Sequence, residues 1–430
     1  MGFKVMYGQS ILGDGTPACM IPLLTGKLEH ELPSTLKTDP NGRFVDQAYP
    51  FIWNDLHKQG YMSYHIEDWP QVSAFTYRLR GMSNKTAHHY LRAYQLSLWK
   101  RVSSAYFSHK DDFCIGTIKR HKKALNLINE FIDTYKARDK NRIAIMHYIE
   151  NSHDSNERAS HLDADLYEFL SENNKNGRFE NTAIVLYSDH GSRFSLERLT
   201  PQGYLEERSP FFSVYLPKSF QQAYPEKYEN LMRNSEQITT AFDVYATLRE
   251  LGCVDKEAER PESKPLRSLS LLSDIPASRS CADIGISLHY CVCQLDWLEL
   301  SPSDEMAARA SQFIIDYINS ELISQAEEYC ARLSVGKLFY VKTYRAEGLV
   351  HYKVNLLTRP NAANYEVLLT SNVNNSTGFS ISSAESISRS NPYGSQPSCL
   401  LSMPPSKKLT ADLRKFCFCA GSKGRLLRKS

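Results

Sequence analysis

The sequence of 430 residues has no apolar run near the roughly 18 residues that a membrane-spanning helix needs. Residues 1–6 also lack the apolar stretch and small-residue cleavage site of a signal peptide. The formal net charge is only +3, and no stripe of aromatic and basic residues suggests a nucleic-acid surface. The sequence therefore predicts no membrane span in this chain and no nucleic-acid partner, and it contains no targeting signal.

Cysteine is sparse through most of the chain and concentrated at its end. Seven of the ten cysteines lie beyond residue 280, and they include two Cys-x-Cys pairs. This clustering is typical of a disulfide framework in a secreted protein, and we expect Cys281, Cys291 and Cys293 to participate first. A zinc site is the alternative, although Cys-x-Cys matches zinc spacing less well than Cys-x2-Cys. Free buried thiols are a third interpretation.

Three Asn-x-Ser/Thr triplets point to the same compartment. They begin at Asn84, Asn374 and Asn375 and fit N-glycosylation, although such triplets also arise by chance. Together with the cysteines they indicate the extracellular space or the secretory lumen, which conflicts with the missing targeting signal. We therefore expect this chain to be a fragment or isoform of a longer secreted or membrane-anchored protein.

Residues 1–253 have the pattern of an α/β domain. Residues 142–149 and 181–187 are apolar enough for buried strands, and residues 161–171 between them have the apolar spacing of an amphipathic helix. A strand, a helix and a second strand form a βαβ unit, whose two strands run parallel. The sequence therefore predicts an α/β fold built on a mainly parallel sheet.

The remainder of the chain differs in composition and in its pattern of apolar residues. Residues 254–280 are charged and Ser-rich, which predicts a linker or an exposed excursion. Within the Cys-bearing region 281–430, alternating patterns predict a small antiparallel sheet, and the Ser- and Asn-rich segment 372–398 is predicted to be mobile. The expected strands of that sheet are Lys337–Val341, Leu349–Leu357 and Tyr365–Thr370.

Polar residues follow both strands of the predicted βαβ unit. Ligands of open parallel sheets bind beyond the carboxyl ends of the strands. One strand delivers Asp189 and His190 to that edge, and the other delivers His153. An Asp beside a His offers an oxygen and an imidazole to a divalent metal. The alternative is that Asp189 only begins a turn and His190 is solvated.

Thr16 is the third element of the candidate site. Thr16 and Pro17 form a helix-start signal, and the helix should end near Gly26. A hydroxyl at a helix N-terminus lies where backbone N–H groups favour an anion. It becomes a nucleophile when a base or a metal lowers its pKa. The alternative is that Thr16 serves only as the N-cap of the helix.

These motifs, in this order, resemble a sulfatase-like branch of the alkaline-phosphatase superfamily long classed as a domain of unknown function, DUF229. The resemblance runs from about residue 1 to residue 300. It is carried by Gly13-Asp14-Gly15-Thr16-Pro17 through Leu23-Leu24-Thr25-Gly26, Gly60-Tyr61, Glu67-Asp68-Trp69-Pro70, Ser188-Asp189-His190-Gly191-Ser192-Arg193-Phe194, the segment 200–208, Cys281 and His289-Tyr290-Cys291-Val292-Cys293.

The resemblance implies an α/β/α sandwich that performs metal-assisted hydrolysis or transfer of phosphate, phosphodiester or sulfate esters. In that family's terms Thr16 would be the nucleophile, and Asp189 and His190 would hold a divalent metal (Zn, Ca, Mg or Mn). His153 would be a further ligand or would bind oxygens of the transferred group. Arg193, within the same string as Asp189, would bind substrate.

Two departures from the family pattern qualify this expectation. The superfamily usually supplies another metal carboxylate from the end of the first strand, and we expect that Asp to lie before Met1, which would weaken metal binding. No Cys-x-Pro-x-Arg or Ser-x-Pro-x-Arg string is present, which disfavours the formylglycine route of sulfatases and favours phosphoryl chemistry on Thr16. The alternatives are an extracellular pseudo-enzyme or binding module that keeps the fold without catalysis, and an ordinary α/β protein with chance motifs.

Overall fold

The structure, a computed structural model, describes residues 1–105, 114–153, 156–254, 266–293, 295–346, 348–372, 375–403 and 413–420. The chain forms two compact units. The α/β unit comprises Met1–Lys37, Asn41–Ser192 and Glu206–Gly285. The C-terminal unit comprises Thr38–Pro40, Arg193–Leu205 and Ile286–Ser430. Across the described ranges, no helix combines the length and the apolar character that a membrane crossing requires.

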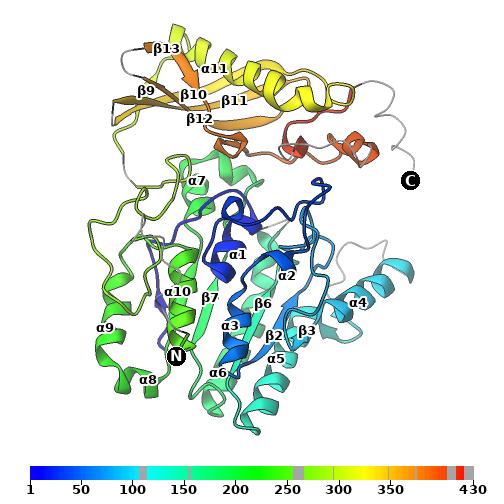
Figure 1. Cartoon of the computed structure of the whole chain (residues 1–430), viewed down its shortest axis with the longest axis vertical. Coiled ribbons are helices and arrows are strands. Elements are labelled where there is room, and N and C mark those ends of the chain that lie inside the picture. The colour runs from blue at the N-terminus through cyan, green and yellow to red at the C-terminus, as the bar shows by residue number, and fades with distance from the viewer. Residues whose placement is uncertain are drawn as a thin grey trace. The chain divides into compact units, whose positions relative to one another are not determined.

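The α/β unit contains two three-stranded sheets, in the orders β1-β8-β7 and β3-β2-β6 (Figure 1). The bounds are β1 Lys4–Val5, β2 Met62–Glu67, β3 His89–Tyr90, β6 Arg142–His147, β7 Ile184–Tyr187 and β8 Phe212–Tyr215. Strand β2 runs parallel to both β3 and β6, so the predicted parallel sheet is present. Strand β7 instead pairs antiparallel with β8, and no described ladder joins it to β6.

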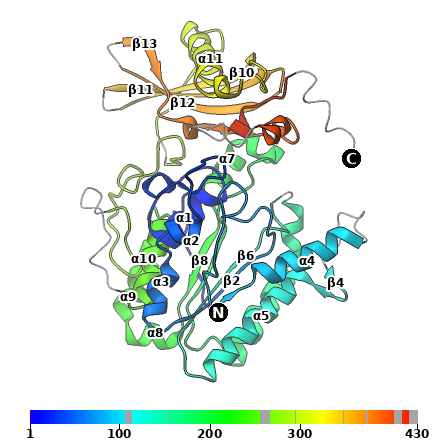
Figure 2. The same cartoon turned by 45° about the vertical axis from the view of Figure 1, so that its right-hand side comes forward.

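Helices cover both faces of these strands. Ile143 and Ile145 of β6 and Val185 of β7 pack into the core that contains α1 (Thr16–Thr25), α3 (Ile52–Lys58) and α10 (Ala241–Leu251). On the other face, Tyr64 and Ile66 of β2 pack with α5 (Arg120–Lys136) and α6 (Asp163–Lys175). Figure 2 shows helix α5 beside strand β2. Successive side chains of a strand point to opposite faces, which explains this division. The α/β class is confirmed.

The α/β unit has further helices beside those that cover the sheets. They are α2 (Val45–Ala48), α4 (Arg92–Ala105), α8 (Lys218–Ala223) and α9 (Pro225–Asn234), and α7 (Pro201–Arg208) begins in the C-terminal unit. A two-stranded hairpin joins β4 (Cys114–Ile115) to β5 (Ile118–Lys119).

Helix α1 begins one residue earlier than the Thr-Pro signal suggested. Its N-cap is Gly15, with φ of 77°, and Thr16 is the first helical residue. No side chain caps the helix, so the interpretation of Thr16 as N-cap is wrong. At the other end Gly26 has φ of 68°, and a Cβ there would lie 2.5 Å from the Tyr245 ring. Gly26 therefore stops the helix where the sequence predicted.

Part of the expected linker is packed into the α/β unit. Residues 255–265 lie outside the described ranges, but Leu271 and Leu272 are almost fully buried. The Asp243 carboxylate of α10 accepts a hydrogen bond from the backbone N–H of Leu269 at 2.9 Å and pairs with Arg279 at 2.7 Å. Because serines alternate with the leucines, the composition of this segment predicted an exposed excursion. That prediction is wrong for residues 266–280.

The C-terminal unit is an antiparallel sheet in the order β13-β12-β11-β10-β9, with β14 also paired to β12. The bounds are β9 Leu298–Leu300, β10 Ser334–Ala346, β11 Leu349–Arg359, β12 Asn364–Asn372, β13 Asn375–Ser380 and β14 Ile387–Arg389. Helix α11 (Glu305–Tyr317) packs on β10 and β11. The predicted antiparallel sheet is present.

Strands β13 and β14 fall inside the segment 372–398 that we expected to be mobile. Both pair with β12, and Ile387 is fully buried in the core of the unit. Strand pairing uses backbone groups, which Ser and Asn supply as well as apolar residues do. The Ser/Asn composition therefore misled the prediction of mobility there.

The segment Arg193–Leu205 lies early in the chain but belongs to the C-terminal unit. The Lys353 ammonium donates a hydrogen bond to the Tyr204 hydroxyl at 2.7 Å. The Arg198 guanidinium lies 3.9 Å from the Glu366 carboxylate, and both residues are buried. Polar side chains of β11 and β12 therefore hold this segment.

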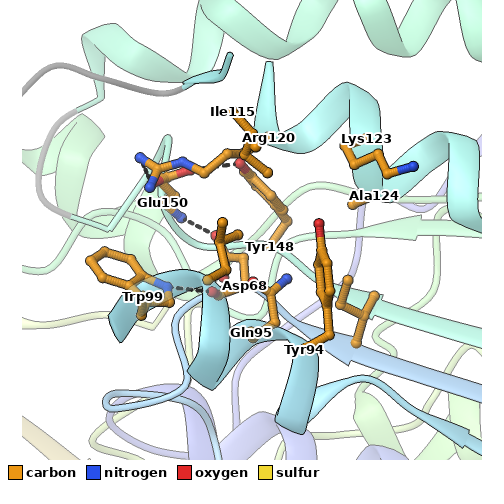
Figure 3. Close-up of a pocket in the computed structure, with 12 residues that line it drawn as sticks. Asp68, Tyr94, Gln95, Trp99, Ile115, Arg120, Lys123, Ala124, Tyr148 and Glu150 are labelled. Atoms are coloured by element: carbon orange, nitrogen blue, oxygen red, sulfur yellow. Dashed lines mark hydrogen bonds and ion pairs between the residues drawn. The ribbon is translucent and has the colours of Figure 1, made fainter. Parts of the chain in front are cut away.

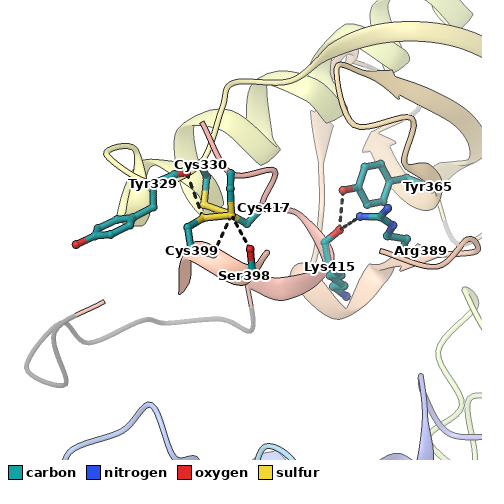
Figure 4. The surroundings of a disulfide bond; sticks show 9 residues. Tyr329, Cys330, Tyr365, Arg389, Ser398, Cys399, Lys415 and Cys417 are labelled. Carbon is teal, nitrogen blue, oxygen red and sulfur yellow. Dashed lines mark hydrogen bonds between the residues drawn. A yellow bond between two sulfur atoms is a disulfide. The ribbon is translucent and has the colours of Figure 1, made fainter. Parts of the chain in front are cut away.

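Disulfides close the C-terminal unit (Figure 4). Cys330 is bonded to Cys417, and Cys399 is bonded to Cys419. The carbonyl oxygen of Lys415 accepts hydrogen bonds from the Tyr365 hydroxyl at 2.7 Å and from Arg389 at 3.1 Å, which anchors the same segment (Figure 4).

The other three cysteines of this region differ in their bonding. Cys281 and Cys291 are also disulfide-bonded, whereas Cys293 is an exposed thiol. The disulfide interpretation is confirmed for six of the seven clustered cysteines and is wrong for Cys293. Oxidised sulfur offers no thiolate, so the zinc interpretation is wrong for those six.

Candidate active site

The site is built where β7 ends and α1 begins. Asp189 follows β7 by two residues, and its side chain is partly buried, at 16% exposure. The Thr16 hydroxyl, on the first residue of α1, lies close enough to the Asp189 carboxylate to lower the pKa of Asp189. The structure therefore brings together the predicted nucleophile and the predicted metal carboxylate.

His190 is oriented by the backbone that follows it. Its Nδ1 lies 2.7 Å from the carbonyl oxygen of Gly191, which can only accept, so Nδ1 carries the proton. In the neutral ring Nε2 then has the free electron pair, and Nε2 lies 3.5 Å from Asp189 Oδ2. A metal-ligating imidazole commonly has this arrangement, with one nitrogen tied to a carbonyl and the other facing the ion.

Gly191 allows this turn to pack closely. A Cβ at Gly191 would lie 2.2 Å from the carbonyl oxygen of Glu206, which is backbone that cannot move aside. The Gly191 N–H also donates to the carbonyl oxygen of Glu207 at 3.1 Å. Glycine is therefore required beside the Asp189-His190 pair.

Asp189 is held as a carboxylate. Burial disfavours its charge, but His190, His147 and the Thr16 hydroxyl outweigh burial and place the pKa of Asp189 below its usual value. One of its oxygens, Oδ2, is buried and has no hydrogen-bond partner among the described residues. A charged oxygen left without a donor suits a cation better than a hydrophobic core.

Sequence reasoning missed three buried polar residues of this region. Glu67 and His147 are adjacent partners in the β2–β6 ladder, and His147 Nδ1 lies 3.6 Å from Glu67 Oε1. Burial opposes the charge on His147, but Glu67 and Asp189 raise its pKa above the usual value. His65 lies two residues before Glu67 and is fully buried, and burial lowers its pKa.

A signal for these residues was present in the sequence. Ser63, His65 and Glu67 alternate with the apolar Tyr64 and Ile66 along β2. Polar residues at every second position of a strand that is buried on both faces mark one polar face. His147 has the parity of Ile143 and Ile145 in β6, which face the core that contains α1.

His153, the predicted third ligand, lies on the loop after β6. It is exposed, its N–H donates to the carbonyl oxygen of Ile149 at 2.9 Å, and its ring centroid lies 6.1 Å from that of Trp69. The β6 histidine whose charge acts on Asp189 is His147. A ligand role for His153 stays a prediction.

The structure gives positions for most of the other predicted site residues, and their functional roles stay predictions. Arg193 belongs to the C-terminal unit, where its guanidinium lies 5.1 Å from the Phe194 ring centroid. Asn84 is exposed, and its N–H donates to Asp46 at 3.1 Å. Asn374 lies outside the described residues, and Asn375 begins β13.

The residues present fit a metal as an anchoring set rather than a closed cage. Asp189 supplies a buried oxygen, His190 an oriented nitrogen, and Thr16 a hydroxyl. Over the described ranges no third His, Cys, Asp or Glu completes an Asp189–His190 group whose ligand atoms all lie within 4.8 Å. A catalytic metal keeps open positions for substrate, and this set leaves such positions.

A neighbouring polar cluster braces the loop after β6 (Figure 3). The Asp68 carboxylate accepts hydrogen bonds from the N–H of Ile149 at 3.0 Å and of Glu150 at 2.8 Å. Glu150 pairs with Arg120 and accepts from the Tyr148 hydroxyl at 2.7 Å. The cavity among these side chains is about 10 Å³, room for one water at most. This cluster is therefore structural.

The Asp68 carboxyl should make stability depend on pH. Burial raises its pKa to about 6, although the two backbone donors oppose this. A folded-state pKa above the unfolded value of about 3.9 means that stability is lost as pH rises from about 4 to about 6. We expect Asp68→Asn to remove about 3 kcal/mol of that decline, measured by urea unfolding at a series of pH values. Parallel stability curves for the two proteins would contradict the shifted pKa.

The sequence matches the family described as "Protein of unknown function (DUF229)" over residues 1–338, which is most of the chain. The chain belongs to the DUF229 family. The resemblance drawn from the motifs is thereby confirmed at the level of the family. The matched DUF229 residues include the candidate site, from Thr16 to His190.

Two further comparisons concern curated proteins and solved structures. No curated protein matches it. Among solved structures it is similar to the lipoteichoic acid synthase LtaP from Listeria monocytogenes, at 12% identity and a TM-score of 0.39. That similarity covers 64% of this chain and 67% of the LtaP chain.

Proposed function

We propose that this chain is a metal-dependent hydrolase or transferase of phosphate, phosphodiester or sulfate esters, with Thr16 as its nucleophile. The proposal rests on the Thr16 hydroxyl at the start of α1 lying close enough to the Asp189 carboxylate, in the turn after β7, to lower the pKa of Asp189. Capping does not explain the hydroxyl, because Gly15 caps α1. The site thus combines a hydroxyl, a carboxylate and an imidazole with the fold expected for the sulfatase-like branch of the alkaline-phosphatase superfamily.

Each residue has a role that follows from its contacts. The Thr16 oxygen attacks the phosphorus or sulfur atom as the bond from that atom to the ester oxygen breaks, and the Thr16 proton passes to the nearby Asp189 carboxylate. The leaving ester oxygen departs as an alcohol or alkoxide, and water or an acceptor hydroxyl later releases the group from Thr16. Asp189 and His190 would hold a divalent metal, Zn, Ca, Mg or Mn, which would supply positive charge to the esterified group and to the attacking hydroxyl. The N-terminus of α1 adds a partial positive charge beside the anionic group. His153 and Arg193 are proposed to bind substrate oxygens.

Phosphoryl transfer is favoured over sulfuryl transfer. The sequence has no Cys-x-Pro-x-Arg or Ser-x-Pro-x-Arg string, so the formylglycine route has no starting residue. Disulfides are typical of oxidising compartments, which supports an extracellular or lumenal location and N-glycosylation at Asn84, Asn374 and Asn375.

The second candidate is an extracellular pseudo-enzyme or binding module. It is favoured by the small ligand set, because Asp189 and His190 find no third acidic, His or Cys ligand within 4.8 Å across the described ranges. A site with two strong ligands binds metal weakly, and weak binding would reduce catalysis.

Metal titration and ester hydrolysis of the purified chain decide between the two. Zn²⁺, Mn²⁺, Mg²⁺ and Ca²⁺ are titrated by calorimetry, and bis(p-nitrophenyl) phosphate, p-nitrophenyl phosphate and p-nitrophenyl sulfate serve as substrates. We expect metal-dependent hydrolysis that Asp189→Asn abolishes and that Asp165→Asn, which alters a carboxylate paired with His121, leaves unchanged. Metal binding without hydrolysis would support the pseudo-enzyme, and hydrolysis unaffected by Asp189→Asn would contradict the proposed site.

A further inference from the structure

We propose that a cavity between α3 and the loop before β3 binds the phosphate group of a small organic phosphate ester through His57, Lys85 and His88. The cavity has a volume of about 370 Å³, which falls within the range of roughly 300–1,000 Å³ for small-molecule sites. Its lining residues belong to the α/β unit and include none of the proposed catalytic or metal-binding residues. This inference therefore goes beyond the proposed function and does not depend on it.

The two histidines are held by one buried serine. Ser63, the second residue of β2, is 2% exposed. Its N–H donates to His88 Nδ1 at 3.2 Å, and its Oγ accepts from the N–H of His88 at 3.0 Å. The same Oγ lies 2.6 Å from His57 Nε2, and the two imidazole centroids are 4.3 Å apart. Ser63 therefore fixes both rings at the wall of the cavity.

These contacts assign the protons of the two rings. His88 Nδ1 has one electron pair and uses it to accept the N–H of Ser63, so the neutral ring carries its proton on Nε2. The Ser63 hydroxyl proton is then left for His57 Nε2, which places the His57 proton on Nδ1. Burial and the neighbouring His88 lower the pKa of His57, which favours its neutral form. His57 Nδ1 and His88 Nε2 have no hydrogen-bond partner in the described part of the chain, so each offers an N–H donor to a ligand.

A third donor, Lys85, lies on a loop that Asp46 holds in place. The Asp46 carboxylate accepts from the N–H and the hydroxyl of Ser83, both at 2.7 Å, and from the N–H of Asn84 at 3.1 Å. Lys85 follows directly, lines the cavity, is exposed and forms no ion pair with any described residue. Because the Asp46 carboxylate is already bonded to this loop, the ammonium charge of Lys85 stays available for an anion.

The wall of the cavity is short of hydrogen-bond acceptors. Trp53 Nε1 and Thr86 Oγ1, on two further lining residues, are buried without a hydrogen-bond partner among the described residues. Native structures rarely leave such atoms unpaired. A carboxylate has two oxygens, whereas a phosphate monoester has three unesterified ones and can accept from His57, Lys85 and His88 together. The rest of the volume has room for an organic part.

Calorimetric titration of the full chain with inorganic phosphate tests this inference. The metal-free chain is used at low salt, so that the proposed active site lacks the cation that would attract the same anion. We expect phosphate to bind more tightly than acetate, and phenyl phosphate to bind at least as tightly as phosphate. Lys85→Gln and His88→Asn should each weaken phosphate binding by about 10-fold, because each removes one donor to the anion.

Matched variants control for folding and for general charge. The Asn side-chain oxygen can replace His88 Nδ1 as the acceptor for Ser63, so His88→Asn removes the Nε2 donor and keeps the structural bond. Lys58→Gln removes an exposed ammonium of α3 that pairs with Asp55 at 2.9 Å, and it should leave phosphate binding unchanged. If His88→Asn does not fold, Lys85→Gln carries the test, because Lys85 is exposed.

The outcomes separate this cavity from the candidate active site. Asp189→Asn should bind phosphate as the unmodified chain does, and loss of binding in that variant would overturn the inference by assigning the anion to the active site. No phosphate binding, equal affinity for acetate, exclusion of phenyl phosphate, full affinity in Lys85→Gln or an equal loss in Lys58→Gln would also overturn it. Failure of the metal-dependent hydrolysis would leave phosphate binding in the cavity unaffected.

Discussion

Replacing Thr16 with alanine should lower metal-dependent turnover by on the order of 10³-fold or more, because the substitution removes the attacking oxygen itself. The fold should survive. Gly15 caps α1, the Thr16 side chain makes no capping bond, and alanine favours a helix more than threonine does. We expect the free energy of unfolding to change by less than about 1 kcal/mol. Steady-state hydrolysis and thermal unfolding of the same preparation measure both quantities.

Two companion variants sharpen this experiment. Thr16→Ser keeps a hydroxyl and should retain part of the turnover, with a phosphorylated residue 16 detectable by mass spectrometry after acid quenching. Thr25→Ala removes the other threonine of α1, whose hydroxyl donates to the carbonyl oxygen of Ile21 at 2.7 Å, and should leave turnover unchanged. Full turnover in Thr16→Ala would reduce Thr16 to an ordinary first residue of a helix.

The second large effect is expected in the C-terminal unit. The Cys330–Cys417 bond closes a loop of 87 residues, and the Cys399–Cys419 bond closes one of 20. Loop-closure entropy predicts losses of about 4.6 and about 3.3 kcal/mol when each pair is replaced by serine. The larger loss belongs to the longer loop because more conformations of the unfolded chain become accessible without that bond.

Urea unfolding of the two double-serine variants measures this difference. Trp297 is the tryptophan of the C-terminal unit, and its fluorescence reports on that unit when Trp53, Trp69 and Trp99 are replaced by phenylalanine in every protein compared. A larger loss on removing Cys399–Cys419 would show that native contacts near Lys415, rather than the unfolded chain, dominate the effect.

The sequence predicted the parts of the fold that depend on local pattern. The end of α1 at Gly26 followed from glycine, and the start of β6 at Arg142 followed from an apolar run. The partner of β7 did not, because pairing with β8 depends on segments far away in sequence. Composition also gave a wrong prediction of exposure around Leu271, which lies in a buried apolar segment that is rich in serine.

The sequence likewise singled out some residues of the candidate site and missed others. Asp189, His190 and Thr16 stood out because each follows or begins an element, where ligands gather. His147 did not, because it sits inside an apolar strand and was counted as part of it. Its relation to Glu67 appears only when β2 and β6 are placed in register.

The path of the chain through the two units has a consequence for dissecting the protein. Arg193 follows the Asp189-His190-Gly191 turn by two residues, and from there to Leu205 the chain is part of the C-terminal unit before it returns at Glu206. A cut after Gly285 would therefore strip Lys353 and Glu366 away from Tyr204 and Arg198. The loosened segment would begin directly beside the turn that carries Asp189 and His190, the proposed metal ligands. Truncation would therefore loosen the backbone that continues directly from that turn. The last third of the chain helps to fix the segment that follows the turn and is not a detachable tail.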